Sequence, residues 1–198
     1  MAKPVTSKTS IDMNKFRLRT FVDKLIDIGE VEVHDEAVPL SELSRIIEAT
    51  PKAVLFRKAG PEQVELVSSV AGGRRRVAAA FGVPVDSVWK EYLKRLESPQ
   101  PVIEVTSGDA PVHEVVIQGD DVDLTKLPFH PQHEFDGSTY LSSGIDYTID
   151  PETGTTNVGC RRLSLRNRRE VGTNVTAPSD LKRIYTKAVA RGQRLPVS

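Results

Sequence analysis

Two β-rich segments around a short turn constrain the fold of this chain more than any other feature. Residues 140–149 (YLSSGIDYTI) and 158–169 (VGCRRLSLRNRR) carry many β-branched, aromatic and aliphatic side chains, and DPETGTTN stands between them. Pro, Gly and Asn favour a tight connection, and two such runs beside one favour antiparallel pairing. The sequence therefore predicts a long β-hairpin in the second half of the chain.

The residues before this hairpin alternate between helical and β patterns. The predicted elements, in order, are a helix ending at Gly29, a short strand over 31–33, a helix over 41–49 capped by Ser41, two β runs (AVLFRKA and VELVSSVAG), a helix after Gly72-Gly73 and a helix over 85–96. Such alternation predicts a mixed α/β domain over residues 14–100. Residues 1–13 are small and polar, and are expected to form a flexible lead-in.

From Pro101 the pattern becomes β-rich, which predicts a domain boundary there and a second domain over residues 101–198. Its predicted parts are two β runs (PVIEV and HEVVIQG), a loop over 120–137, the hairpin, a closing helix after Pro178 that Gly192 ends, and a strand entry at Leu195-Pro196-Val197. The predicted fold class is α+β, with a mixed N-terminal domain and a β-rich second domain.

Composition narrows the functional classes. The 198 residues include 38% hydrophobic residues, enough for a buried core. Lys plus Arg (27) balance Asp plus Glu (27), so no global charge favours nucleic acid or an anionic membrane. The single Cys160 cannot form an internal disulfide, and no apolar run reaches the roughly 20 residues of a membrane helix. A cytoplasmic protein without nucleic-acid or membrane partners is expected.

Arginines along the second hairpin strand form the most informative candidate site. Strand alternation places five residues on one face: Cys160, Arg162, Ser164, Arg166 and Arg168. Like charges in a row repel one another unless an anion or an acid opposes them. The sequence leaves two answers open, an anionic ligand such as a phosphate or carboxylate, or acidic side chains on a facing surface.

Other candidate residues favour structural interpretations. His130 and His133 have a metal-type spacing, but Pro131 argues against a helix that aims both at one ion, so a loop pair is preferred. Surface positions are expected for the remaining histidines, His34 and His113, and an inert role for Cys160. The run Arg74-Arg75-Arg76 after two glycines suits an anion at a helix start, although a solvated basic face is preferred.

The string DPETGTTNVGCRR, with TYLSSGIDYTI before it and APSDLKRIY after it, resembles the UbiD-type decarboxylase family. The resemblance extends to FVDKLIDIGEVEVHDE, to the Gly-Gly-Arg-Arg-Arg-Val-Ala helix start and to the Leu-Pro loop, and so covers nearly all of the chain. It implies that the second domain begins a split β-barrel that binds flavin. It also implies reversible decarboxylation of an aromatic or α,β-unsaturated carboxylic acid with prenylated FMN, whose phosphate is held through Mn²⁺ with K⁺ nearby.

The resemblance assigns roles to individual residues. Asn157 corresponds to the asparagine that ligates the metal, and Arg162 to the arginine of a catalytic glutamate-arginine-glutamate network. Ser143, on the preceding strand, is expected near the substrate. The stretch that runs along the flavin in the family corresponds to Gly159, Cys160 and Arg161. A guanidinium fork suits the arginine role because it can hold a carboxylate at two points.

The chain also departs from the family pattern. A second metal ligand is often a His after this strand, but EVGTNVTAPSD contains none, so that Thr173 or Asn174 stands there. The third metal ligand and both network glutamates lie beyond residue 198 in the family. The chain alone is therefore expected to be inactive, and to be completed by a C-terminal portion or a second decarboxylase subunit, with homo-oligomers and a flavin prenyltransferase as further expected partners.

Two alternatives remain open at this stage. The chain could be a non-catalytic structural or interaction subunit of a decarboxylase complex. It could also be a plain FMN-binding oxidoreductase module, because split barrels host such sites and a fold does not determine a function.

Overall fold

The computed structural model describes residues 12, 14, 17–99 and 104–198. Residues 1–11 and 13, which make up almost all of the predicted lead-in, and the predicted domain boundary at residue 100 lie outside the described residues. The chain divides into two compact units. The described residues of unit 1 lie within residues 1–36, 47–57 and 65–103, and those of unit 2 within 37–46, 58–64 and 104–198. The predicted division into domains 14–100 and 101–198 stays a prediction.

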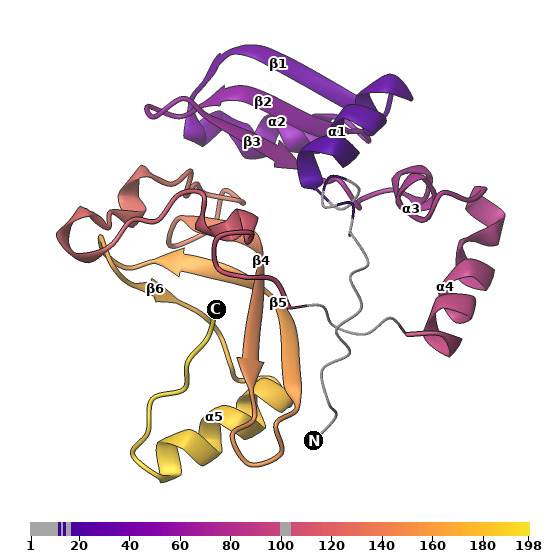
Figure 1. The fold of residues 1–198 in the computed structure, drawn as a ribbon. Helices are drawn as coiled ribbons and strands as arrows, with labels where there is room; N and C mark the ends of the chain where they lie inside the picture. The colour runs from indigo at the N-terminus through magenta and orange to yellow at the C-terminus, as the bar shows by residue number, and fades with distance from the viewer. Residues whose placement is uncertain (1–11, 13, 15–16, 100–103) are drawn as a thin grey trace. The chain divides into compact units, whose positions relative to one another are not determined.

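The N-terminal elements follow the predicted alternation of helices and strands (Figure 1). They are α1 (Leu18–Asp27), β1 (Val31–Val38), a 3₁₀ turn (Leu40–Glu42), α2 (Leu43–Ala49), β2 (Ala53–Ala59), β3 (Val64–Ser68), α3 (Arg74–Phe81), a second 3₁₀ turn (Val85–Ser87) and α4 (Val88–Glu97). The three strands form one sheet in the order β1-β2-β3. The fold class predicted from the sequence, α+β with a mixed N-terminal portion, is confirmed.

Local sequence explains where these elements end. Gly29 follows α1 with φ +73° and Gly82 follows α3 with φ +71°, a left-handed conformation that glycine adopts without a steric penalty. The predicted cap at Ser41 is wrong. Pro39 precedes a 3₁₀ turn over Leu40–Glu42, and α2 begins only at Leu43, because the fixed φ of proline starts the turn earlier.

Apolar side chains of α1 and of the first sheet form the core of unit 1. Val22 and Leu25 of α1 pack with Val31, Ala53 and Leu55, and all five are buried. The two helix residues lie three apart and therefore share one face. This face is the reason that the apolar periodicity of the segment predicts the helix correctly.

His34 is partly buried, so the predicted surface position is wrong for this residue. Its ring stacks on Phe56 with centroids 5.4 Å apart, and its two nitrogens lie 3.0 Å from carboxylate oxygens of Glu36 and Glu32. Strand alternation explains this arrangement, because residues two apart on β1 share a face. The hydrogen bond to Glu36, helped by Glu32 and opposed by burial, raises the pKa of His34 above its ordinary value.

The raised pKa of His34 predicts a pH-dependent contribution to stability. The folded chain holds the proton more tightly than the unfolded chain, whose His pKa is about 6.5, so the contribution is complete below that pH. It should be lost as the pH rises through the higher folded-state pKa. Urea unfolding between pH 6 and pH 9 should show this loss in the wild type and not in His34→Gln. Parallel pH profiles for the two proteins would contradict the assignment.

The second sheet contains the predicted hairpin. Strand β4 (Tyr140–Ile149) pairs antiparallel with β5 (Thr156–Leu165), and β5 pairs with the short β6 (Val171–Gly172), as Figure 1 shows. The strand ends earlier than predicted. Residues 166–170 form a turn in which Arg166 N donates to Glu170 O, so Arg166 and Arg168 lie beyond the strand.

The predicted β runs PVIEV and HEVVIQG are not strands where the structure describes them. Residues 101–103 lie outside the described part, and the following stretch contains 3₁₀ turns at Pro111–His113, Gly119–Asp121 and Leu124–Lys126. Val112, Val115 and Ile117 are exposed. An alternating pattern makes a strand only where a neighbouring strand pairs with its backbone, and the described residues offer none here.

Helix α5 (Asp180–Ala190) closes the chain as predicted, with Ser179 Oγ accepting a hydrogen bond from Lys182 N. Leu181, Ile184 and Ala188 are buried, whereas Tyr185 and Val189 are about half exposed. After the helix the chain returns to β4. Ser198 and Tyr147 exchange both backbone hydrogen bonds, 2.7 and 3.0 Å long, in agreement with the predicted strand entry.

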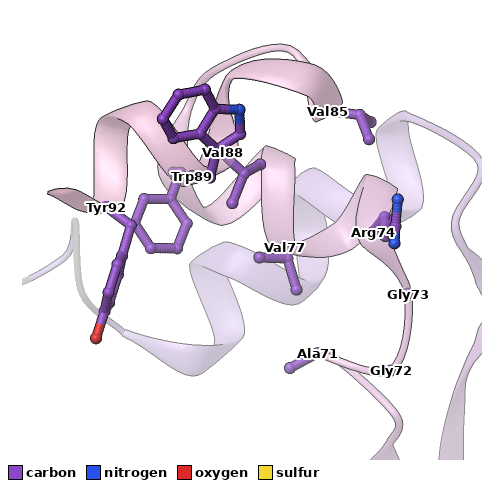
Figure 2. A pocket seen from close by; sticks show the side chains of 10 residues that line it. Ala71, Gly72, Gly73, Arg74, Val77, Val85, Val88, Trp89 and Tyr92 are labelled. Atoms are coloured by element: carbon purple, nitrogen blue, oxygen red, sulfur yellow. The ribbon is translucent and has the colours of Figure 1, made fainter.

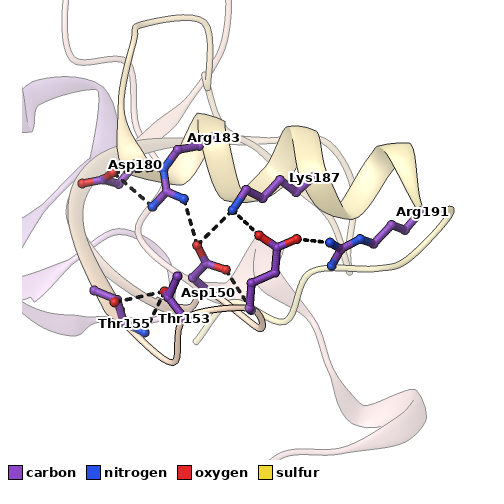
Figure 3. A network of polar contacts seen from close by, with 8 residues as sticks. Asp150, Thr153, Thr155, Asp180, Arg183, Lys187 and Arg191 are labelled. Atoms are coloured by element: carbon purple, nitrogen blue, oxygen red, sulfur yellow. Dashed lines mark hydrogen bonds and ion pairs between the residues drawn. The ribbon is translucent and has the colours of Figure 1, made fainter.

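Ion pairs hold α5 to the turn of the β4–β5 hairpin (Figure 3). Asp150 is fully buried and contacts Arg183 (2.9 Å) and Lys187 (3.6 Å), while Glu152 pairs with Lys187 and Arg191. Burial acts to raise the pKa of Asp150, but the hydrogen bond from Arg183 and the charge of Lys187 outweigh it and lower that pKa. The hairpin turn and the closing helix thus form one charged junction. None of the described helices is long and apolar enough to cross a membrane.

Candidate functional site

The two faces of the β4–β5 hairpin carry different side chains. On one face Leu163 lies opposite Leu141, Arg161 opposite Gly144, Gly159 opposite Asp146 and Asn157 opposite Thr148. The other face carries Tyr140 and Ser164, Ile145 and Cys160, and Tyr147 and Val158 as opposing pairs, together with Arg162. The alternation predicted for β5 is therefore confirmed up to Ser164.

A β-bulge interrupts the ladder beside Arg162. The register moves from Leu141–Leu163 to Gly144–Arg161, so that Ser142 and Ser143 together stand opposite Arg162. Ser143 adopts φ +58°, which is uncommon for a residue with a side chain. Bulges redirect side chains and are frequent next to active sites. The resemblance implies that Ser143 lies near the substrate, but nothing in the sequence alternation indicated the extra residue.

Unit 2 has a cavity of about 790 Å³ along the Arg162 face. Arg162, Arg166 and Lys182 are basic residues of its lining, and Thr173, Asn174 and Thr176 are polar ones. Arg161 also borders the cavity, although its guanidinium pairs with Asp146 on the other face of β5. A cavity of this size is within the range of small-molecule and cofactor sites. The structure therefore brings Cys160, Arg161 and Arg162 to one cavity together with Thr173 and Asn174, the two residues expected at the position of the missing histidine.

Asn157 and Gly159 do not line this cavity. They lie on the opposite face of β5, where Arg161 Nε stands 2.9 Å from Asp146 Oδ1. This charge pair is largely buried, with side-chain exposures of 17% and 13%. Asn157 Nδ2 is buried without a hydrogen-bond partner among the described residues. A buried amide without a partner is rare, and it marks a position where a ligand could be accepted.

Acidic side chains pair with arginines of β5 and of the turn after it. The sequence left open whether an anionic ligand or facing acids would balance these charges, and facing acids are present. The pairs are Arg161–Asp146, Arg162–Asp136, Arg168–Asp123 and Arg169–Asp120. Three of these acids come from the loop before β4. No sequence pattern indicates which residues of that loop lie next to β5. The hydroxyl of Thr125, assisted by its backbone N–H and the Arg168 charge, lowers the pKa of Asp123. The acids leave Arg162 half exposed to the cavity.

Gly159 is required by the packing of its neighbours. A Cβ at this position would lie 2.5 Å from Asp146 Oδ1 and 2.8 Å from Arg161 Nη2. We predict that Gly159→Ala lowers the free energy of unfolding by about 1–3 kcal/mol, because a largely buried ion pair must move. Gly137→Ala is the matched control, since its added Cβ would meet nothing within 4 Å. Equal urea midpoints for both variants would contradict this account.

The histidines of the loop before β4 have the structural roles that the sequence favoured. His130 is buried and its Nδ1 lies 3.0 Å from Pro128 O, while His133 Nδ1 accepts a hydrogen bond from Phe135 N. Among residues 12, 14, 17–99 and 104–198, no three His, Cys, Asp or Glu side chains come together as metal ligands. The described His, Cys, Asp and Glu side chains therefore do not form a three-ligand metal site by themselves.

The three arginines after Gly72-Gly73 have separate roles in unit 1. Arg74 borders a cavity of about 740 Å³ between α3 and α4, where Val77, Val88 and Trp89 supply apolar walls (Figure 2). Arg75 is exposed and pairs with Glu30. Arg76 is buried, and it bonds to Glu30 Oε2, Ser69 O and Pro51 O. The preferred interpretation of the run as a solvated basic face is therefore wrong for Arg76.

Comparison with known proteins places this site in a family. Residues 29–96 match the 3-octaprenyl-4-hydroxybenzoate carboxy-lyase N-terminal domain model (UbiD_N), and residues 103–198 match the Rift-related domain model of the same carboxy-lyase (UbiD). The two matches lie in the order that the resemblance required. The chain belongs to the UbiD family.

Two curated relatives of this UbiD-family chain are decarboxylases. Anhydromevalonate phosphate decarboxylase of Methanosarcina mazei is 30% identical over 91% of this chain, and phenolic acid decarboxylase of Sedimentibacter hydroxybenzoicus is 27% identical over 91%. The chain spans 41% of the length of each of these two proteins.

Solved structures agree in fold. An evolved dimeric form of the UbiD-class enzyme HmfF from Pelotomaculum thermopropionicum, in complex with prFMN, matches with a TM-score of 0.83 and 28% identity, over 90% of this chain and 42% of that one. Vanillic acid decarboxylase (ShVdcCD) of Sedimentibacter hydroxybenzoicus in its closed form matches with a TM-score of 0.83 and 27% identity, over 90% and 41%.

Proposed function

We propose that this chain forms the N-terminal part of a carboxy-lyase that reversibly decarboxylates an aromatic or α,β-unsaturated carboxylic acid with prenylated FMN. The observation that carries the proposal is Arg162, whose half-exposed guanidinium lines a basic cavity large enough for a flavin or a small acid. Membership of the UbiD family supports a catalytic role for this arginine. The positive charge of the cavity favours a carboxylate at its wall.

Arg162 is proposed to bind the substrate carboxylate. Its bond to Asp136 uses Nη1, and the rest of the planar fork is available to hold a carboxylate in a defined orientation. Orientation matters because the carboxylate must be held in the geometry from which carbon dioxide can leave. Ser143, which stands in the bulge opposite Arg162, is proposed as a second contact with the substrate.

The described residues fit a flavin better than a metal. Cys160 and Arg161 border the cavity and are proposed, with Gly159, to run along prenylated FMN, which when bound supplies an electron sink for the carbanion character left by decarboxylation. Asn157 is proposed as one ligand of Mn²⁺ through its carboxamide oxygen, as the resemblance implies, and its buried, unpartnered Nδ2 could donate a hydrogen bond to a nearby acceptor such as a phosphate. Further ligands for Mn²⁺, and those for K⁺, are proposed to come from residues outside the described part.

Completion of the site is part of the proposal. The relatives are more than twice as long as this chain, so the acids that return a proton after decarboxylation are proposed to come from a C-terminal portion or a partner subunit. The HmfF structure is of a dimeric form, and vanillic acid decarboxylase is named ShVdcCD. A second decarboxylase subunit or a homo-oligomer is therefore proposed, with a flavin prenyltransferase as cofactor supplier in the cytoplasm.

The proposal is tested by reconstitution. The chain is combined with the remaining part of its enzyme and loaded with prenylated FMN, and release of carbon dioxide is measured from a panel of aromatic and α,β-unsaturated acids. Exchange of labelled bicarbonate into the acids tests the reverse direction, and unmodified FMN is the control. We expect the reconstituted enzyme to release carbon dioxide when it is loaded with prenylated FMN and not when it is loaded with unmodified FMN. Nicotinamide oxidation without carbon dioxide release would instead support an FMN oxidoreductase, and cofactor binding without either reaction would support a structural subunit.

A further inference from the structure

Arg162 is held in place from two sides by residues of its own unit. Its guanidinium carbon lies 4.1 Å from the centroid of the Tyr140 ring, a cation–π contact, and Nη1 lies 3.3 Å from Asp136 Oδ1. A long arginine side chain that is half exposed loses considerable rotamer freedom when it is held in one conformation. Two contacts on one guanidinium therefore indicate a side chain whose direction is set before any ligand binds.

Asp136 is itself fixed by backbone contacts. Its Oδ2 accepts hydrogen bonds from Gln132 N (3.0 Å) and His133 N (3.1 Å), and its own N donates to His133 O. The carboxylate is 12% exposed. One oxygen thus organises the loop over residues 132–136, and the other contacts Arg162. A carboxylate held in this way sets the position of the guanidinium more firmly than a mobile surface acid would.

Tyr140 reaches Arg162 because of the bulge at Ser142 and Ser143. Side chains alternate along a strand, so Tyr140 and Ile145 would face opposite sides of a regular β4. The extra residue reverses the alternation and places both on the face of Arg162. Tyr140 is also joined to the loop, since it exchanges both backbone hydrogen bonds with the buried His130.

We propose that Asp136 and Tyr140 are positioning residues that orient Arg162 toward the substrate carboxylate. This inference rests on the proposed function and adds a part of the site that lies in the loop before β4. Asp136 does not contact substrate in this scheme. It acts through Arg162 by contacting Nη1, so that the remaining edge of the guanidinium faces the cavity.

A double-mutant cycle separates positioning from a merely structural role. In the reconstituted enzyme, Asp136→Asn should lower kcat/KM about tenfold in the wild-type background and have almost no further effect in Arg162→Ala. Tyr140→Leu should behave in the same way, whereas Tyr140→Phe, which keeps the ring, should retain activity. Asp120→Asn is the matched control, because Asp120 belongs to the same unit and pairs with the exposed Arg169. Additive losses in Asp136→Asn and Arg162→Ala would overturn the inference.

A spectroscopic readout on the whole chain does not depend on activity. The Nε–H proton of Arg162 should resonate upfield because of the Tyr140 ring, and the shift should be lost in Tyr140→Leu and altered in Asp136→Asn but not in Asp120→Asn. If the wild-type enzyme releases no carbon dioxide while these shifts occur, the proposed function fails and the positioning contacts stand. If the Arg162 Nε–H resonance is unchanged in both Tyr140→Leu and Asp136→Asn, the inference is overturned, whether or not the enzyme releases carbon dioxide.

Discussion

Arg162→Ala is expected to lower kcat/KM for decarboxylation by the reconstituted enzyme about 10²–10³-fold, the usual cost of removing a preorganised charged donor. The side chain binds the carboxylate in the proposed site, and alanine has no charged donor to take its place. Arg162→Lys should recover part of the loss, because it keeps the charge but not the fork. Steady-state carbon dioxide release under saturating prenylated FMN measures both effects.

The stability of the Arg162→Ala chain should change little, because the side chain is half exposed. Arg169→Ala serves as the matched control, since Arg169 is also half exposed and ion-paired, with Asp120 as its partner. Its activity should equal that of the wild type. If Arg162→Ala kept full activity while the wild type required prenylated FMN, the catalytic assignment would be wrong although the family would still be correct.

Arg76→Ala is expected to lower the free energy of unfolding by about 3–5 kcal/mol, because it removes the buried donor of two backbone carbonyls and leaves the largely buried Glu30 with only the exposed Arg75 as a partner. The Arg76 side chain is 3% exposed, and its bonds reach Glu30, Ser69 O and Pro51 O. Alanine would leave two backbone carbonyls and one carboxylate with fewer donors. Urea unfolding followed by the fluorescence of Trp89, the single tryptophan, reports on the same unit.

Arg75→Ala is the control for this prediction. This substitution removes the same charge from the same helix. Arg75 pairs with the same Glu30 as Arg76, but its side chain is 73% exposed. Surface ion pairs contribute about 0–1 kcal/mol, so the loss should be small. If the two variants unfolded at the same urea concentration, the central role of Arg76 in unit 1 would be refuted.

Most elements could be predicted because each has a local cause. The apolar face of α1, the glycines after α1 and α3, and the turn residues between β4 and β5 act within a few positions of the sequence. The predicted strand in HEVVIQG failed for the opposite reason. Its alternation is compatible with a strand, but strand formation depends on a partner that lies elsewhere in the chain.

The candidate site also has a part that the sequence indicated and a part that only the structure showed. The position of Arg162 on β5, its neighbours Cys160 and Arg161, and the family itself were available from the motif DPETGTTNVGCRR. The partners of Arg162 were not. Asp136 lies 26 residues before Arg162, in a loop without periodicity, and no local pattern indicates which acid faces which arginine.

The β4–β5 hairpin depends on both local sequence and tertiary structure. The sequence by itself determined that two strands pair around a tight turn, because turn chemistry and β-propensity are local. Only the tertiary structure decided that Ser142 and Ser143 share one position opposite Arg162, which brings Tyr140 to the same face. The reason is physical: a bulge is selected by the packing and hydrogen bonds of both strands and the loop beside them, and these contacts exist only after the chain has folded.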